Sequence, residues 1–168
     1  TMFKLRILPY KPGRRAARYL KNVLGGLRVR FNGRFRPKPQ HLVVNWGSAH
    51  QPAWWPFVDH GLNAPREVER SSNKLTALQT MKAAGVSVVA FTTYIAQARA
   101  WFEAGKAVVG RSVLNGHGGI GCHLFNEPGG QLEPYCPLFT LHLRHKREFR
   151  IHVFTGRIID MVEKLKLR

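Results

Sequence analysis

The stretch VVGRSVLNGHGGIGCHLF, residues 108–125, places four glycines within six positions. Its GHGGIG segment fits the G-x-G-x-x-G pattern, which binds the phosphates of dinucleotides when a strand precedes it and a helix follows. The residues that follow, IGCHLF, instead alternate like a strand, and the run soon ends at a proline. The sequence therefore argues against a dinucleotide-binding turn and predicts two strands joined by a glycine-rich loop.

A glycine-rich loop between two strands is suited to cover phosphate groups. Glycine reaches positive φ without a Cβ clash, and its backbone N–H can approach a phosphate oxygen closely. Protein kinases use such a flap, but they also need a V-A-I-K lysine and the H-R-D and D-F-G motifs. None of these motifs occurs in the sequence, so a kinase is not supported.

Composition predicts a folded and strongly basic protein. The 168 residues are 44% hydrophobic and include four Trp and ten Phe, enough for one core or two small lobes. The formal net charge is +18, and residues 1–40 hold twelve Lys or Arg and no carboxylate. Such a segment attracts polyanions, including nucleic acid. The alternative is that balancing acids belong to a missing segment or to a partner subunit.

The sequence shows no apolar run of transmembrane length and no secretory signal, so we expect a cytoplasmic protein without a membrane partner. Cys122 and Cys136 are too far apart for a C-x-x-C site. We interpret them as reduced cytosolic cysteines.

The first third of the chain predicts a small α/β lobe. Residues 3–10 and 41–47 are typical of strands, and residues 16–26 of a helix closed by glycine. A basic hairpin turning at Asn32-Gly33 is expected between them. Residues 48–66 are interpreted as a loop whose aromatic side chains pack on the core rather than stack on a base. These aromatic residues are Trp54, Trp55 and Phe57.

The rest of the chain predicts two helices followed by strands. Residues 71–85 form a helix with Ser and Asn near its start, residues 86–93 a strand, and residues 94–105 a second helix. Strands are expected on both sides of the glycine loop. Later strands are expected at 138–145, 148–154 and 156–168, with a hairpin turn at Thr155-Gly156. The predicted fold class is α/β with antiparallel strands (α+β).

Three segments together resemble the ATP-grasp superfamily. They are LNAPREVERSSNKLTALQTMKAAGVSVVAFTT (62–93), VVGRSVLNGHGGIGCHLF (108–125) and EFRIHVFTGRIIDMVEKLKLR (148–168). The likeness is closest to the phage-encoded and peptide-modifying amide-ligase branches. It implies a pre-ATP-grasp lobe over residues 1–66 and a nucleotide-binding region over residues 67–168.

The resemblance implies a set of residues for ATP phosphates. Lys74, at a helix start, would reach the phosphates, and Arg111 would contact the α-phosphate side. The loop would fold over the β- and γ-phosphates, because cations and amides stabilise concentrated negative charge. The loop residues are Asn115, Gly116, His117, Gly118 and Gly119.

The resemblance also implies roles for the later strands. The backbone of residues 140–143, including Leu141 and Leu143, would pair with adenine, and Glu148 would bind the ribose hydroxyls. Arg150 or Lys164 would act as catalytic cations that stabilise the transferring phosphoryl group.

Each role has a structural alternative. Lys74 could be a solvated residue of a first helical turn, and Glu148 could form a surface ion pair with a neighbouring arginine. His117, at a flap tip, is expected to be exposed. Arg111 is harder to explain structurally, because an unpaired cation in an apolar strand is unfavourable.

Members of the superfamily bind Mg²⁺ through carboxylates and an Asn beyond the last strand expected here. After Glu148 the sequence offers only Asp160 and Glu163, so no set of magnesium ligands is identified. The expected function is ATP-dependent ligation of a carboxylate to an amine, by a chain that is a fragment or has lost its metal-binding part. The rival is a basic, non-catalytic nucleic-acid-binding or virion-associated protein on the same scaffold, which would bind through residues 1–58.

Overall fold

A computed structural model describes residues 2–10, 14–116, 118–127, 130, 132, 135–145 and 147–164. The chain forms two compact units, each described below by itself. The N-terminal unit comprises Thr1–Val88 with Arg111–Cys122, and the C-terminal unit comprises Val89–Gly110 with His123–Arg168. In the described residues, no helix has both the length and the apolar character that crossing a bilayer requires.

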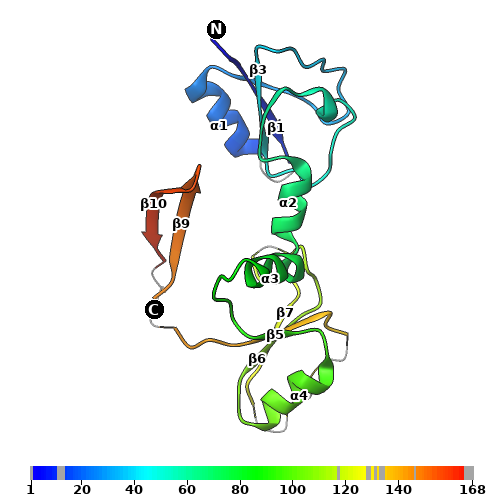
Figure 1. The fold of residues 1–168 in the computed structure, drawn as a ribbon, viewed down its shortest axis with the longest axis vertical. Coiled ribbons are helices and arrows are strands. Elements are labelled where there is room, and N and C mark those ends of the chain that lie inside the picture. The colour runs from blue at the N-terminus through cyan, green and yellow to red at the C-terminus, as the bar shows by residue number, and fades with distance from the viewer. Residues whose placement is uncertain are drawn as a thin grey trace. The chain divides into compact units, whose positions relative to one another are not determined.

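The N-terminal unit is built on a four-stranded parallel sheet (Figure 1). The strand order is β2-β1-β3-β4, and every neighbouring pair is parallel. Helix α1 (Arg14–Leu24) lies between β1 and β2, as expected for parallel strands, which need a crossover connection that is usually a helix. The strands are β1 (Lys4–Pro9), β2 (Leu27–Arg28), β3 (His41–Trp46) and β4 (His60–Leu62).

The core of this unit lies where β1 and β3 meet the 53–58 segment. Leu8, Val43 and Trp54 are buried together with Val29. The Trp54 indole also donates a hydrogen bond to the Arg30 carbonyl (3.3 Å). The prediction that this aromatic group packs on the core is confirmed for Trp54. It is wrong for Phe57, which is 72% exposed.

Two predictions for this unit are wrong. Residues 27–36 form no antiparallel hairpin at Asn32-Gly33, because β2 instead extends the parallel ladder of β1 and the Val29 amide donates to the Ile7 carbonyl. Residues 48–66 are not all loop: they contain a 3-10 turn (Trp55–Phe57), β4, and the start of α2 (Pro65–Ser72). Pro65 occupies the first turn of α2, where its fixed φ favours a helix and its missing N–H is not needed.

Helix α3 (Lys74–Ala83) begins where the sequence predicts. The Asn73 side chain accepts a hydrogen bond from the Thr76 amide (3.1 Å), which caps the helix. The same residue ends α2, so one asparagine separates two consecutive helices. Lys74 is therefore held at the first position of α3.

The C-terminal unit contains a second sheet, in the order β5-β8-β6-β7. Helix α4 (Ile95–Glu103) packs on it, and Ala98, Val108 and Phe139 are buried in its core with Leu132 and Cys136. Strand β7 starts directly after Gly121, which confirms the predicted strand and rules out a helix at that point. The strands are β5 (Phe91–Thr92), β6 (Val108–Arg111), β7 (Cys122–Phe125) and β8 (Leu138–Leu141).

The expected strands at 86–93 and 138–145 are longer than the observed β5 and β8. Only Phe91 and Thr92 of the first stretch pair with β8, through Thr140 and Phe139. Residues 86–89 are not part of the ladder, although their composition favours a strand, and Ala90 contributes only its carbonyl, which accepts from the Leu141 amide.

A two-stranded ribbon follows, formed by β9 (Phe149–Phe154) and β10 (Arg157–Glu163). Thr155 and Gly156 both have positive φ (47° and 76°), as the predicted two-residue turn requires. The pairing is antiparallel, with an irregularity at Ile159 between the pairs of Ile158 and Asp160. The predicted hairpin is confirmed over the described residues; residues 165–168 lie outside them.

Candidate functional site

The loop between β6 and β7, residues 112–121, is held in a defined conformation that depends on glycine. Gly118, Gly119 and Gly121 have φ of 60°, 84° and 68°, in the left-handed region. The Ser112 amide donates to the Gly121 carbonyl (2.9 Å), and the Cys122 amide donates to the Gly119 carbonyl (3.0 Å). A Cβ on Gly116 would lie 2.5 Å from the Ile120 carbonyl oxygen, so the loop turns tightly on itself. His117 lies outside the described residues.

The start of α3 binds this loop. The Lys74 amide donates to the Leu114 carbonyl (3.0 Å). The Lys74 ammonium donates to the carbonyl oxygens of Ser72 and Gly116, each at 2.9 Å. Lys74 is partly buried, so it is not a freely solvated first-turn residue. Its charge lies against the backbone of the glycine loop, separated from Gly116 by 42 positions in sequence.

Arg111 closes the base of the same loop. Its guanidinium donates to the Cys122 sulfur (2.8 Å), so the two residues that flank the loop are joined by their side chains. Arg111 is partly buried, and Asn115 is exposed. The N-terminal unit thus brings together Lys74, Arg111 and the loop, three of the features that sequence analysis singles out.

In the C-terminal unit, the backbone expected to pair with adenine lies at the end of β8. The Leu141 amide donates to the Ala90 carbonyl (3.0 Å), and the His142 amide donates to the Ala107 carbonyl (2.9 Å). These two donors are therefore used within the sheet. Leu143, which is 59% exposed, follows the last paired strand residue.

The ribbon places three candidate residues on one face. Arg150 pairs with Val162, and the Lys164 amide donates to the Glu148 carbonyl (2.8 Å). Because directly opposed residues of an antiparallel pair share a face, Glu148, Arg150 and Lys164 lie on the same side of the ribbon. The Lys164 ammonium also forms an ion pair with the Glu148 carboxylate, which His145 approaches at 3.7 Å. The structural alternative for Glu148 was a surface ion pair with a neighbouring arginine. Glu148 does form an ion pair, but with Lys164.

Two elements of this arrangement were not predicted from the sequence. The guanidinium of Arg147 binds the Glu163 carboxylate through two hydrogen bonds (2.8 and 2.7 Å) and lies over the Phe149 ring, 4.7 Å from its centroid. The hydrogen bond to Glu163 raises the pKa of Arg147, and the same bond lowers the pKa of Glu163. The second is Cys122, whose position directly after the glycine loop was the available signal for its contact with Arg111.

A magnesium site does not follow from the described residues. No group of three or more His, Cys, Asp and Glu side chains among them could hold a metal ion. Glu163, one of the two acids after Glu148, is held by Arg147, and Asp160 pairs across the ribbon with His152. The described residues therefore identify no ligand set for Mg²⁺, whereas the cations and amides around the glycine loop are groups of the kind that bind phosphate.

Comparisons with known proteins give a match in fold. No protein-family model matches the chain, and no curated protein matches its sequence. Among solved structures, D-alanyl-alanine synthetase A from Vibrio cholerae matches with a TM-score of 0.63 at 13% sequence identity. The match covers 94% of this chain, which spans only 65% of the length of that structure. The predicted fold class is confirmed: the chain has an ATP-grasp-like α+β fold.

Proposed function

We propose that the chain is the nucleotide-binding part of an ATP-dependent carboxylate–amine ligase. The observation that supports this most strongly is the contact between the Lys74 ammonium and the glycine loop. Lys74, the start of α3 and the glycine loop are then the groups that would bind the triphosphate. The ligase named in the structural comparison supports an ATP-grasp ligase in general terms.

In this proposal, ATP phosphate oxygens replace the Ser72 and Gly116 carbonyls as acceptors of the Lys74 ammonium. Two neutral carbonyls hold the ammonium less strongly than a phosphate does, because the negative charge of a phosphate oxygen adds a Coulomb attraction between opposite charges that a carbonyl lacks. Arg111 exchanges its weak sulfur acceptor for the α-phosphate side of the nucleotide. The loop amides of residues 115–119 then cover the β- and γ-phosphates.

The remaining assignments belong to the C-terminal unit. The backbone of residues 140–143, including Leu141 and Leu143, would pair with adenine, and Leu143 lies beyond the end of β8. Glu148 would bind the ribose hydroxyls after releasing Lys164, and Lys164 with Arg150 would then face the transferring phosphoryl group. The common face of these three residues on the ribbon supports this grouping.

The reaction we propose proceeds in two steps. A substrate carboxylate oxygen attacks the γ-phosphorus of ATP, and ADP leaves with the electrons of the broken P–O bond. An amine then attacks the acylphosphate carbonyl, loses a proton, and expels phosphate to leave an amide. The cations and amides of the site stabilise the charge that develops on the phosphoryl oxygens.

The same proposal includes the limits of the two lobes, the branch of the superfamily, the location of the protein and its metal. We place a pre-ATP-grasp lobe at residues 1–66 and the nucleotide-binding region at 67–168, and we assign the chain to the phage-encoded or peptide-modifying branches and to the cytoplasm. Mg²⁺ would accompany ATP, although no group of three or more His, Cys, Asp and Glu side chains among the described residues could hold it.

The ligase proposal is tested by trapping the acylphosphate. The chain is incubated with ATP, Mg²⁺ and a panel of amino acids and short peptides, with hydroxylamine as the amine. We expect a hydroxamate and an equal amount of ADP with at least one acid, and loss of both in Lys74→Met. ADP formation that is independent of any acid would contradict the ligase chemistry.

A second function is favoured by the charge of the N-terminal unit. Arg28, Arg30, Arg34, Arg36 and Lys38 are all exposed, and the first carboxylate of the chain is Asp59. We propose nucleic-acid binding by residues 1–58 as the rival or additional activity. Its signature is an affinity that falls steeply with salt, because released counterions drive such binding.

A further inference from the structure

We infer that the pocket between the 33–37 and 53–57 segments of the N-terminal unit is a base-stacking site for single-stranded nucleic acid. This inference rests on the second proposed function, nucleic-acid binding by residues 1–58. It adds the location of the site, the residue that stacks, and the single-stranded form of the partner.

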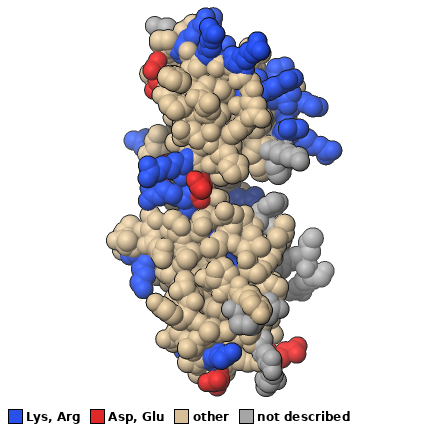
Figure 2. All heavy atoms as spheres, turned by 90° about the vertical axis from the view of Figure 1, so that its right-hand side faces the viewer, with Lys and Arg blue, Asp and Glu red and all other residues tan. Residues whose placement is uncertain are grey.

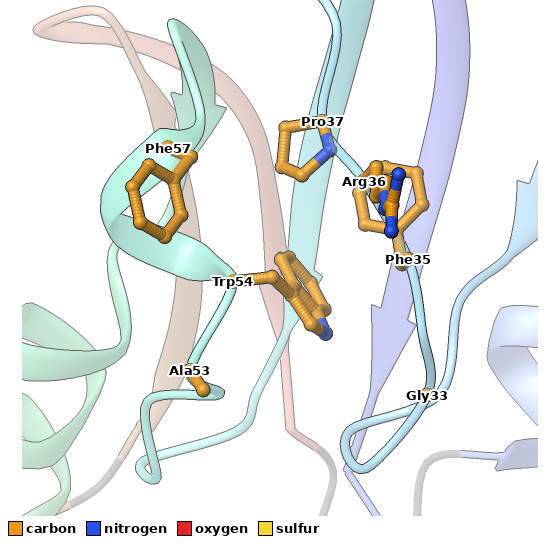
Figure 3. A pocket seen from close by; sticks show the side chains of 7 residues that line it. All are labelled: Gly33, Phe35, Arg36, Pro37, Ala53, Trp54 and Phe57. Carbon is orange, nitrogen blue, oxygen red and sulfur yellow. The ribbon is translucent and has the colours of Figure 1, made fainter.

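The pocket has a volume of about 500 Å³, within the range of small-molecule sites. Figure 3 shows Phe57 on one side of it, with Pro37 and Arg36 on the other and Trp54 between them. The lining residues are Gly33, Phe35, Arg36, Pro37, Ala53, Trp54 and Phe57. Aromatic faces and one guanidinium therefore meet in a single hollow.

Ring contacts and a hydrogen bond hold the aromatic walls of the pocket in place. The Phe35 ring meets the Trp54 ring edge to face (4.9 Å between centroids) and stacks on His41 (5.4 Å). The Trp54 indole N–H is bound to the Arg30 carbonyl. A site that is already ordered loses little conformational entropy when a ligand enters.

Phe57 is exposed, although Trp54, three residues before it, is buried. It is 72% exposed, whereas Trp54 is 7% exposed and belongs to the core. An aromatic ring that contributes little to the core yet borders a pocket is available to stack on a base. Base–aromatic stacking tolerates any base, because every base has a π-face.

Exposed cations are concentrated on the segment that supplies one wall of the pocket. Arg28, Arg30, Arg34, Arg36 and Lys38 are exposed on the 28–38 segment that supplies one wall. In the stretches of chain that the structure describes, none of these five side chains pairs with a carboxylate. On the face drawn in Figure 2, blue Lys and Arg side chains gather over the N-terminal unit, at the top of the view. This arrangement provides charge for a phosphate backbone beside a surface for its bases.

The partner must be single-stranded for the pocket to be used. Bases in a duplex are stacked on one another and offer only their edges to a protein. An unpaired base can leave its neighbours and lie on Phe57 while the adjacent phosphates contact the arginines. A duplex would engage the cations alone.

The test is fluorescence anisotropy of a labelled thymidine 12-mer, titrated with the full chain at several salt concentrations. We expect Phe57→Ala to weaken binding by about tenfold, the loss of one stacked base. Tyr19→Ala, which removes another exposed aromatic side chain from the same unit, is the matched control and should leave affinity unchanged. Arg36→Ala should reduce the slope of log K against log salt by about 0.7, the value for one phosphate contact on a single strand. Arg66→Ala, an exposed cation of α2, should not reduce it.

Three results would overturn the inference. Salt-dependent binding that is equally strong in wild type and Phe57→Ala would leave binding by residues 1–58 intact and remove the pocket. Equal affinity for a duplex of the same length would also leave binding by residues 1–58 intact and remove the pocket as its site. Binding to phosphatidylserine vesicles, lost in parallel in Phe57→Ala, with no binding to the 12-mer, would assign the surface to a membrane and reject both nucleic-acid proposals.

Discussion

Alanine substitutions at three glycines of the 112–121 loop separate backbone strain from steric crowding. Gly118 has φ of 60° and open space around its Cβ position, so Gly118→Ala introduces only the strain of a left-handed residue. Gly116 has no such φ, but a Cβ there would lie 2.5 Å from the Ile120 carbonyl oxygen. Gly121 combines both: its φ is 68°, and a Cβ would lie 2.9 Å from atoms of Ser112 and Val113.

The structure sets the order of the three effects. An L-residue in the left-handed region costs about 1–2 kcal/mol, which applies to Gly118→Ala. Crowding in a packed site costs about 1–3 kcal/mol, which applies to Gly116→Ala. Gly121→Ala incurs both and should cost about 2–5 kcal/mol. A smaller unfolded-state entropy in each alanine variant offsets these values by less than about 1 kcal/mol.

The assay is amide hydrogen exchange at Lys74 and Ser112, whose N–H groups are bound to the carbonyls of Leu114 and Gly121. Gly121→Ala should lower protection at both amides by well over tenfold, since about 1.4 kcal/mol corresponds to a factor of ten. Gly118→Ala should change it by about tenfold or less. If Gly121→Ala were no more harmful than Gly118→Ala, the loop would not be packed against Ser112 and Val113, and the reasoning would fail.

Three further predictions concern other parts of the molecule. Asn45 is fully buried and makes two hydrogen bonds with Ser48 (2.7 and 2.9 Å) and one with Asn63 (2.9 Å). Asn45→Ala should therefore lower the free energy of unfolding, measured by urea denaturation, by about 2–4 kcal/mol. Asn32→Ala, at an exposed position, should leave it unchanged. Burial, followed by the charges of Arg6, Lys38 and Lys4, lowers the pKa of His41 below its usual 6.5. The unfolded chain then binds the proton more readily, so stability should fall as pH decreases below about 6.5, and His41→Gln should lose this component in unfolding measured from pH 7.5 to 5. Gly110→Ala should destabilise the C-terminal unit by about 1–3 kcal/mol in thermal unfolding, because its Cβ would lie 2.8 Å from the Cys136 sulfur and 2.9 Å from Phe125; an unchanged midpoint would contradict that packing.

The sequence predicted those elements whose signals are local. Asn73 as a helix cap, the Thr155-Gly156 turn and the strand after Gly121 follow from short-range rules on capping, turns and alternation. The parallel strands β1 and β3 follow from patterns within the strand itself: apolar and basic residues alternate in the first, and the second has a continuous apolar centre.

The errors arise where a partner distant in sequence decides the structure. Residues 27–29 read as one arm of a hairpin, yet the Ile7 carbonyl and β1 draw them into a parallel ladder. Pro65 reads as a loop residue unless the helix that follows it is recognised. The contacts of Lys74 with Gly116 and of Glu148 with Lys164 span 42 and 16 positions, and no local pattern specifies either.

Isothermal titration calorimetry with ATP and Mg²⁺ measures whether the glycine loop, Lys74 and Arg111 bind the nucleotide. We predict measurable binding by the wild-type chain and an affinity lower by more than about tenfold, or 1.4 kcal/mol, in Arg111→Ala and in Lys74→Met. Arg99→Ala and Lys106→Ala, which remove exposed cations of the other unit, should bind as the wild type does. Equal ATP affinity in all five proteins would contradict the assignment.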